Sequence, residues 1–86
     1  MSEKFYEKCI TVLDSIYKGY SEPEHLRLGA MVTKDVFNEL IEFLGEKDLV
    51  YEIDCGDEVI EYALTDIGLK AINGYRLATE LIETPH

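Results

Sequence analysis

Few residues in this 86-residue chain are of the types that catalyse reactions or bind metal ions. Two histidines, His25 and His86, and two cysteines, Cys9 and Cys55, are spaced in no zinc-binding pattern. Neither histidine has a nucleophile or a second metal ligand close to it in the sequence, as acid–base or nucleophilic catalysis would require. We therefore predict that the protein is not an enzyme and has no catalytic residue, no metal site and no bound cofactor.

Carboxylates dominate the charged side chains. Eighteen Asp and Glu oppose eight Lys and Arg, so the formal net charge is −10. Residues 51–86 carry eight of the acidic and two of the basic side chains, and no basic residue occurs between positions 51 and 66. An acidic surface repels nucleic-acid phosphates and accelerates association with basic proteins. Solubility alone would also account for such a charge.

The apolar periodicity predicts two helices in the first third of the chain. The first covers about residues 3–18, ends at Gly19, and directs inward the set Phe5, Cys9, Val12, Leu13 and Ile16. The second runs from about residue 22 to residue 28 or 30, with Gly29 expected to end it. Ser21 and Glu24 have the spacing of a capping box at its start.

A third helix follows after a short turn, which makes a helix-turn-helix with the second. Its apolar residues recur every three or four positions and are Val36, Phe37, Leu40, Ile41, Phe43 and Leu44. Thr33 is the expected N-cap, because its side-chain oxygen can accept a hydrogen bond from a free N–H of the first turn. This helix should end near residue 47 or 48.

A β-hairpin and a last helix complete the chain. Apolar and polar residues alternate on both sides of Cys55-Gly56-Asp57, which is strand periodicity around a turn. Thr65 should cap a last helix over about residues 66–83, and Gly68 allows that helix to approach the hairpin closely. A seam of Ala71, Tyr75, Ala78 and Ile82 steps by four, three and four along it. This seam could pack against a second copy of the chain or against the first helix of its own chain.

This order of elements resembles the winged helix-turn-helix domains. Residues 44–50, Leu-Gly-Glu-Lys-Asp-Leu-Val, occupy the position of a helix-end segment L-x-x-x-G-L-I, and residues 62–68, Tyr-Ala-Leu-Thr-Asp-Ile-Gly, match Y-x-L-T-x-x-G. Residues 32–37, Val-Thr-Lys-Asp-Val-Phe, are similar to the V-T-x-D-x-F of small phage-derived and archaeal winged-helix proteins, including the YjcQ-like group. Asp48 replaces the family's glycine and is a residue that tolerates the left-handed conformation.

The resemblance implies an α+β winged helix. It would consist of three helices, a two-stranded β-hairpin wing and a C-terminal helix, in a single domain over residues 1–86 with its core at about 5–75. In such domains the third helix enters the major groove of DNA and the wing touches the phosphates. The contacts carried over to this chain would be Arg27, Lys34 and Asn38.

The acidic residues at the same positions favour a different function. We predict an acidic interaction surface, formed by Asp35, Glu39, Glu42, Glu46, Glu52, Asp54, Asp57, Glu58 and Glu61. The first hypothesis is a non-enzymatic, regulatory module that binds a protein with a basic surface, or that inhibits such a protein by mimicking DNA. The alternative is a homodimeric DNA-binding transcription regulator that dimerises through the C-terminal helix.

The sequence also indicates where the protein resides. No apolar run approaches the roughly 18 residues that span a bilayer, and the N-terminus lacks the pattern of a signal peptide. We therefore expect a cytoplasmic protein with no membrane partner. A reducing compartment would keep Cys9 and Cys55 as thiols.

Overall fold

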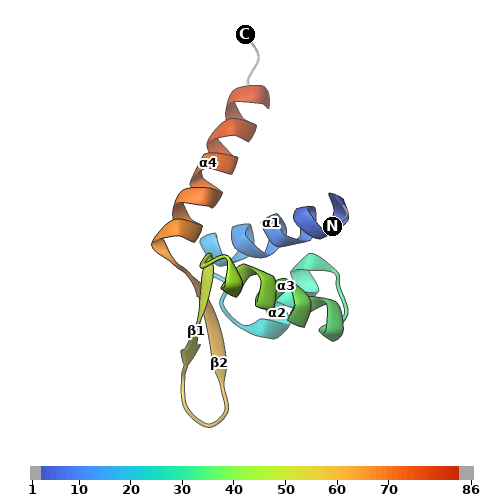
Figure 1. The fold of residues 1–86 in the computed structure, drawn as a ribbon, viewed down its shortest axis with the longest axis vertical. Helices are drawn as coiled ribbons and strands as arrows, with labels where there is room; N and C mark the ends of the chain where they lie inside the picture. The colour runs from blue at the N-terminus through green and yellow to red at the C-terminus, as the bar shows by residue number, and fades with distance from the viewer. Residues whose placement is uncertain (1–2, 84–86) are drawn as a thin grey trace.

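The computed structural model describes residues 3–83, so His86 lies outside the described part of the chain. Six elements follow one another: α1 (Glu3–Tyr17), α2 (Pro23–Ala30), α3 (Lys34–Glu46), β1 (Val50–Asp54), β2 (Ile60–Leu64) and α4 (Asp66–Glu83). The three short helices cluster together, the hairpin extends to one side, and α4 projects in the opposite direction (Figure 1). The predicted α+β class, with its order of helices and strands, is confirmed.

The core lies where α1, α2 and α3 meet. Its buried members are Cys9, Val12 and Leu13 of α1, Leu26 and Ala30 of α2, Phe37, Leu40 and Leu44 of α3, Val50 of β1 and Ile72 of α4. Each helix thus buries the apolar stripe that its 3.6-residue period places on one side. Of the side chains of α4, Ile72 alone is fully buried, so the core holds the first half of that helix and leaves the rest outside.

The start and end of α2 differ from the prediction. The residue before the helix is Glu22, without a side-chain cap, and the Ser21 hydroxyl instead donates to Oε1 of Glu61 on β2 at 2.6 Å. The capping box is therefore wrong, because a charge-assisted bond to a distant carboxylate replaces the local one. Gly29 does not end the helix either. Helix α2 continues to bury Ala30, and Met31 takes the left-handed conformation at φ 58°.

Both ends of α3 follow the prediction. The Val36 N–H donates to Oγ1 of Thr33 at 3.3 Å, which confirms Thr33 as the N-cap. After α3, Asp48 takes the left-handed conformation at φ 59°, and the Leu49 N–H donates to the Leu44 carbonyl at 2.9 Å. The chain then turns directly into β1.

The hairpin is antiparallel, with Val50 paired to Leu64 and Asp54 paired to Ile60. Residues 55–59 connect the two strands. The Cys55 N–H still donates to the Val59 carbonyl at 2.9 Å. Gly56 has the positive φ predicted for it, and Asp57 and Glu58 share that conformation. The tip of the wing is therefore a turn of three successive residues with positive φ.

Helix α4 starts against the base of the hairpin. The Gly68 N–H donates to Oγ1 of Thr65 at 2.9 Å, and Thr65 in turn donates its hydroxyl to the Asp48 carbonyl. A Cβ added at Gly68 would overlap the Leu49 carbonyl oxygen and lie 2.9 Å from its carbonyl carbon. Thr65 as the cap and Gly68 as the residue of close approach are both confirmed.

Candidate nucleic-acid interface

The second and third helices form a helix-turn-helix whose outer face is open to solvent. The turn is held by the Val32 N–H donating to the Arg27 carbonyl at 3.4 Å and by Arg27 donating back to the Val32 carbonyl at 3.1 Å. Helix α3 is anchored from beneath by Leu40 and Leu44, both essentially inaccessible. Its opposite face is therefore presented as a rigid surface.

That face of α3 is polar and mostly acidic. All its predicted members are exposed: Lys34, Asp35, Asn38, Glu39, Glu42 and Glu46. The single cation, Lys34, stands at the first residue of the helix, where the free N–H groups carry the positive end of the helix dipole. The carboxylates of Glu42 and Glu46 follow toward the other end. The one basic side chain of α3 therefore lies at the start of this helix, next to the carboxylate of Asp35.

The wing carries more of the predicted acidic surface. Glu52, Asp54, Asp57 and Glu58 are exposed, so their carboxylates, like those of α3, contact solvent. Cations are scarce nearby. Lys47 lies over the Phe43 ring at 5.6 Å, where a cation–π contact holds it.

Glu61 is engaged within the protein and differs from the other carboxylates of the wing. It accepts hydrogen bonds from the Cys55 thiol at 2.8 Å and from the Ser21 hydroxyl at 2.6 Å. These two bonds lower the pKa of the Glu61 carboxyl, and the bond from Cys55 has the larger effect. The same bond to Glu61 raises the pKa of the Cys55 thiol. Glu61 thus ties the wing to the loop before α2.

Arg27 is also engaged within the chain. Its guanidinium donates to both carboxylate oxygens of Glu24, at 2.9 and 3.2 Å, and to the Val32 carbonyl. The side chain is only 21% exposed. Of the three predicted DNA contacts, Lys34 and Asn38 are open to a ligand on one face of α3, whereas Arg27 stabilises the turn beneath it.

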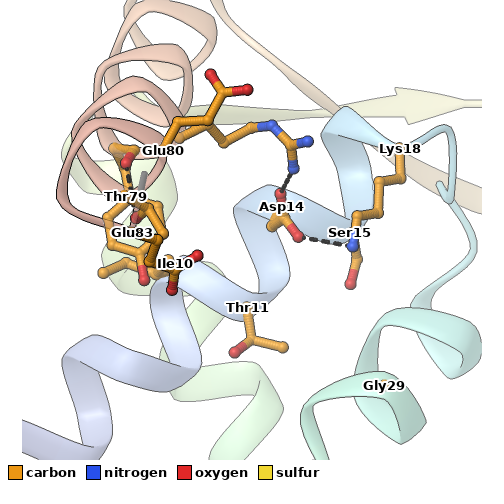
Figure 2. A pocket seen from close by; sticks show the side chains of 11 residues that line it. Ile10, Thr11, Asp14, Ser15, Lys18, Gly29, Thr79, Glu80 and Glu83 are labelled. Atoms are coloured by element: carbon orange, nitrogen blue, oxygen red, sulfur yellow. Dashed lines mark hydrogen bonds and ion pairs between the residues drawn. The ribbon is translucent and has the colours of Figure 1, made fainter. Parts of the chain in front are cut away.

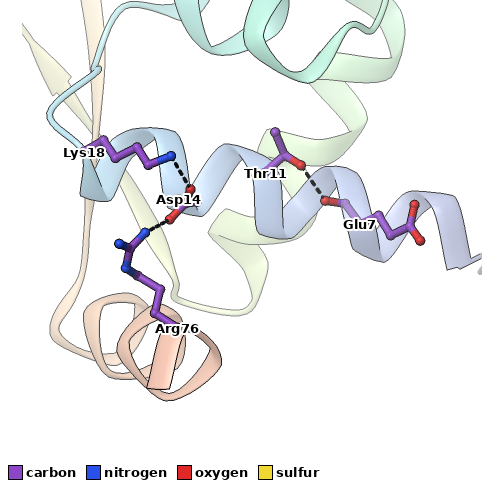
Figure 3. A network of polar contacts seen from close by, with 5 residues as sticks. All are labelled: Glu7, Thr11, Asp14, Lys18 and Arg76. Atoms are coloured by element: carbon purple, nitrogen blue, oxygen red, sulfur yellow. Dashed lines mark hydrogen bonds and ion pairs between the residues drawn. The ribbon is translucent and has the colours of Figure 1, made fainter. Parts of the chain in front are cut away.

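Helix α4 is attached to α1 through a polar contact. The Asp14 carboxylate accepts from Arg76 at 2.6 Å and from Lys18 at 3.0 Å (Figure 3). The Arg76 guanidinium also stacks over the Tyr17 ring at 4.9 Å. Burial pushes the pKa of Asp14 upward, but the two cations outweigh it and leave that pKa below its ordinary value. This contact joins the second half of α4 to the end of α1.

Beyond that contact, a cleft of about 600 Å³ separates α1 from α4 (Figure 2). The four residues of the predicted seam, Ala71, Tyr75, Ala78 and Ile82, are all exposed. Tyr75 is 47% and Ile82 is 82% accessible, and Tyr75 also lines the cleft that faces α1. The apolar side chains Leu77, Leu81 and Ile82 in the second half of α4 are exposed as well.

The described residues 3–83 contain no cluster of three or more His, Cys, Asp or Glu side chains that could hold a metal ion. Cys9 is buried in α1 and Cys55 is exposed in the wing, both as free thiols. No helix among these residues is sufficiently long and apolar to cross a membrane.

Comparison with known proteins identifies the fold. Neither a protein-family model nor a curated protein matches the chain. Solved structures do. MepR, a transcription regulator of the Staphylococcus aureus multidrug efflux pump MepA, superposes with a TM-score of 0.80 at 16% identity over 88% of this chain. RosR of H. salinarum superposes with a TM-score of 0.83 at 16% identity over 92% of this chain. ZitR of Lactococcus lactis superposes with a TM-score of 0.80 at 12% identity over 93% of this chain.

These likenesses show that the chain has the winged-helix fold, as predicted. The chain spans only 58% of MepR, 62% of ZitR and 77% of RosR, so each of these three proteins is longer than this chain. The narrower resemblance to phage-derived and archaeal YjcQ-like proteins finds no support among them and stays a prediction.

Proposed function

We propose that this chain is a non-enzymatic, homodimeric winged-helix transcription regulator that binds duplex DNA through α3 and the wing. The observation that supports it most strongly is the likeness of the whole fold to transcription regulators such as MepR. One such structure is a MepR mutant bound to an oligodeoxyribonucleotide, with a TM-score of 0.79 at 15% identity. The comparisons therefore support the alternative hypothesis more than the protein-binding module.

Within this proposal the first turns of α3 carry the contacts. Lys34 would neutralise a phosphate beside the N-terminus of α3, where the helix dipole also favours an anion. Asn38 lies one turn further along the same exposed face, and its amide can pair with the edge of an adenine. The carboxylates that follow keep the later turns of α3 away from the phosphates.

The scarcity of cations predicts an unusual salt dependence. Each phosphate contact contributes about −0.9 to the slope of log K against log salt concentration. A dimer that uses Lys34 of each protomer, with few other cations, should show a slope of about −2 to −4. Such binding depends less on counterion release and more on base contacts than that of a basic regulator.

Fluorescence anisotropy with a labelled duplex, at low and at physiological salt, tests the proposal. Lys34→Gln should weaken binding several-fold and reduce the salt slope. Lys70→Gln is the matched control, because it removes the same charge from exposed α4 and should leave binding unchanged. Absence of binding at low salt, or equal losses in the two variants, would refute DNA binding through α3.

Dimerisation would bring two copies of α3 onto one duplex. The exposed apolar side chains Tyr75, Leu77, Leu81 and Ile82 support α4 as the interface. Ala78→Glu would place a charge inside the seam and should convert a dimer to a monomer in light scattering. Asn73→Glu, on another face of α4, should not. An identical mass for wild type and Ala78→Glu would exclude the seam as the interface.

The acidic surface favours a second candidate, a module that binds a basic protein, including as a mimic of DNA. Eight of the nine predicted carboxylates are exposed, and Glu61 is the exception because it is engaged by Ser21 and Cys55. Failure of DNA binding at low salt would make this candidate the stronger one.

A further inference from the structure

The wing has one strand edge that nothing in the described chain covers. Among residues 3–83 its sheet consists of β1 and β2. The outer edge of β2 is met by the loop before α2, since the Tyr62 N–H donates to the Ser21 carbonyl at 2.9 Å. No strand or loop of the described chain is paired with the other edge of β1.

The register shows which backbone groups point outward from β1. Because the Tyr62 N–H points to Ser21, its cross-strand partner Glu52 must direct its own N–H and carbonyl away from β2. The same alternation applies to Asp54, two residues further on. The Cys55 N–H donates across to the Val59 carbonyl, in agreement with this register. Glu52 and Asp54 thus offer donors and acceptors to an additional strand.

A cleft lies beside this edge. It measures about 450 Å³ and separates the second half of α3 from β1. Ile41, Val50 and Tyr62 give it apolar walls, and Gly45 opens it, since nothing lies within 4 Å of the place that a Cβ of Gly45 would take. The cleft can therefore receive side chains of a strand that pairs with β1.

The charges around the edge define the chemistry of the partner. Glu42 and Glu52 line the cleft, which has no basic residue in its wall, and the exposed Asp54 follows along the strand. The Glu52 carboxylate is close enough to the Tyr62 phenol to add to the effect of burial, which raises the pKa of Tyr62. Charges on an edge strand normally prevent edge-to-edge pairing. Since these charges are all negative, they exclude a second copy of β1 but attract a positively charged segment.

We propose that the open edge of β1 and the adjoining cleft bind an extended, lysine- or arginine-bearing protein segment by strand addition. The backbone of the segment pairs with Glu52 and Asp54, and its alternate side chains enter the cleft beside Glu42. Main-chain bonds provide the affinity in this mode of recognition, and the side-chain sites provide the selectivity. The proposal is independent of DNA binding and is tested without DNA.

The first test uses three synthetic probes with blocked ends. One is a seven-residue peptide of alternating lysine and valine, the second is the same peptide with every backbone nitrogen methylated, and the third replaces lysine with glutamate. Titration calorimetry at low salt should show binding of the first peptide only. The methylated peptide keeps the charge but cannot pair with the strand. Equal binding of the first two, or no binding of the first, would overturn strand addition.

The second test locates the site. Amide hydrogen exchange should show slower exchange at Glu52 and Asp54 when the lysine–valine peptide is present. The double variant Glu42→Gln, Glu52→Gln should lower the affinity for the lysine–valine peptide by about tenfold, because it removes two charges that flank the bound segment. The matched control Glu39→Gln, Glu46→Gln removes two charges from α3 outside the cleft and should bind as wild type. Equal losses in both double variants, or protection of Glu52 in the free protein, would overturn the proposed site.

Discussion

Two glycines of α4 allow a direct test of how closely this helix contacts the base of the wing. In Gly68→Ala the new methyl group would overlap the Leu49 carbonyl, whose oxygen already accepts a bond from the Thr65 N–H at 3.1 Å. Backbone cannot yield as a flexible side chain can, so α4 must shift and strain the bonds at its start. In Gly74→Ala nothing lies within 4 Å of the added carbon.

The two substitutions should change the free energy of unfolding in opposite directions. Overpacking costs about 1–3 kcal/mol, or more against rigid backbone, and alanine recovers up to about 1 kcal/mol of helix propensity. We expect Gly68→Ala to lower the free energy of unfolding by about 2 kcal/mol, a large part of the roughly 5–10 kcal/mol of a small domain. Gly74→Ala should raise it by about 0.5–1 kcal/mol, since only the propensity changes.

Urea unfolding followed by far-UV circular dichroism measures both variants at one protein concentration, so that any association through α4 affects them alike. The difference between the two variants isolates the steric effect of the Leu49 carbonyl. If the two alanines changed the midpoint in the same direction and by the same amount, α4 would not approach Leu49 as closely as described.

Three further perturbations test the core, a cap and an ion pair. Leu40→Ala should lower the free energy of unfolding by about 2–5 kcal/mol, because Leu40 is completely buried and a cavity would remain; an unchanged denaturation midpoint would contradict the packing of α3. Thr65→Val keeps the shape but removes the cap of α4 and the bond to the Asp48 carbonyl, and should cost about 1–2 kcal/mol in the same assay. The pKa of Asp14 is lowered on folding, so its contribution is present above the ordinary value of 3.8 and is lost as the pH falls through the lower folded value. Asp14→Asn should therefore reduce stability at neutral pH by no more than about 1 kcal/mol and flatten the acid limb of the pH profile, and an unaltered profile would show that Arg76 and Lys18 contribute nothing through it.

The sequence determined the order of elements and most of their boundaries. The caps at Thr33 and Thr65 and the left-handed residue Asp48 depend on bonds within three or four residues, and such signals can be read along the chain. The apolar periods of α1 and α3 are local in the same sense. Gly68 was also predictable, because a glycine just after a helix start beside a hairpin favours close packing of the two backbones.

Side chains that could choose between near and distant partners were decided by the tertiary structure. Ser21 had a local acceptor role as a cap, yet folding brings Glu61 from β2, 40 residues away, within 2.6 Å of its hydroxyl. Arg27 had the type of a phosphate contact, but it is held by Glu24 and the Val32 carbonyl. A one-dimensional pattern contains the types of these groups, whereas their pairing depends on which surfaces the fold brings together.

The function illustrates the same division. The acidic composition is a property of the sequence and favoured a basic protein as the partner. The proposal of DNA binding rests instead on the fold, which resembles that of MepR and RosR. The exposed seam of α4 and the open edge of β1 could be located only after the core was known, because a surface is exposed only where no other part of the chain packs against it. Periodicity shows that a helix or strand has an apolar face, and only the tertiary structure shows whether that face already has a partner, because burial depends on contacts between distant parts of the chain.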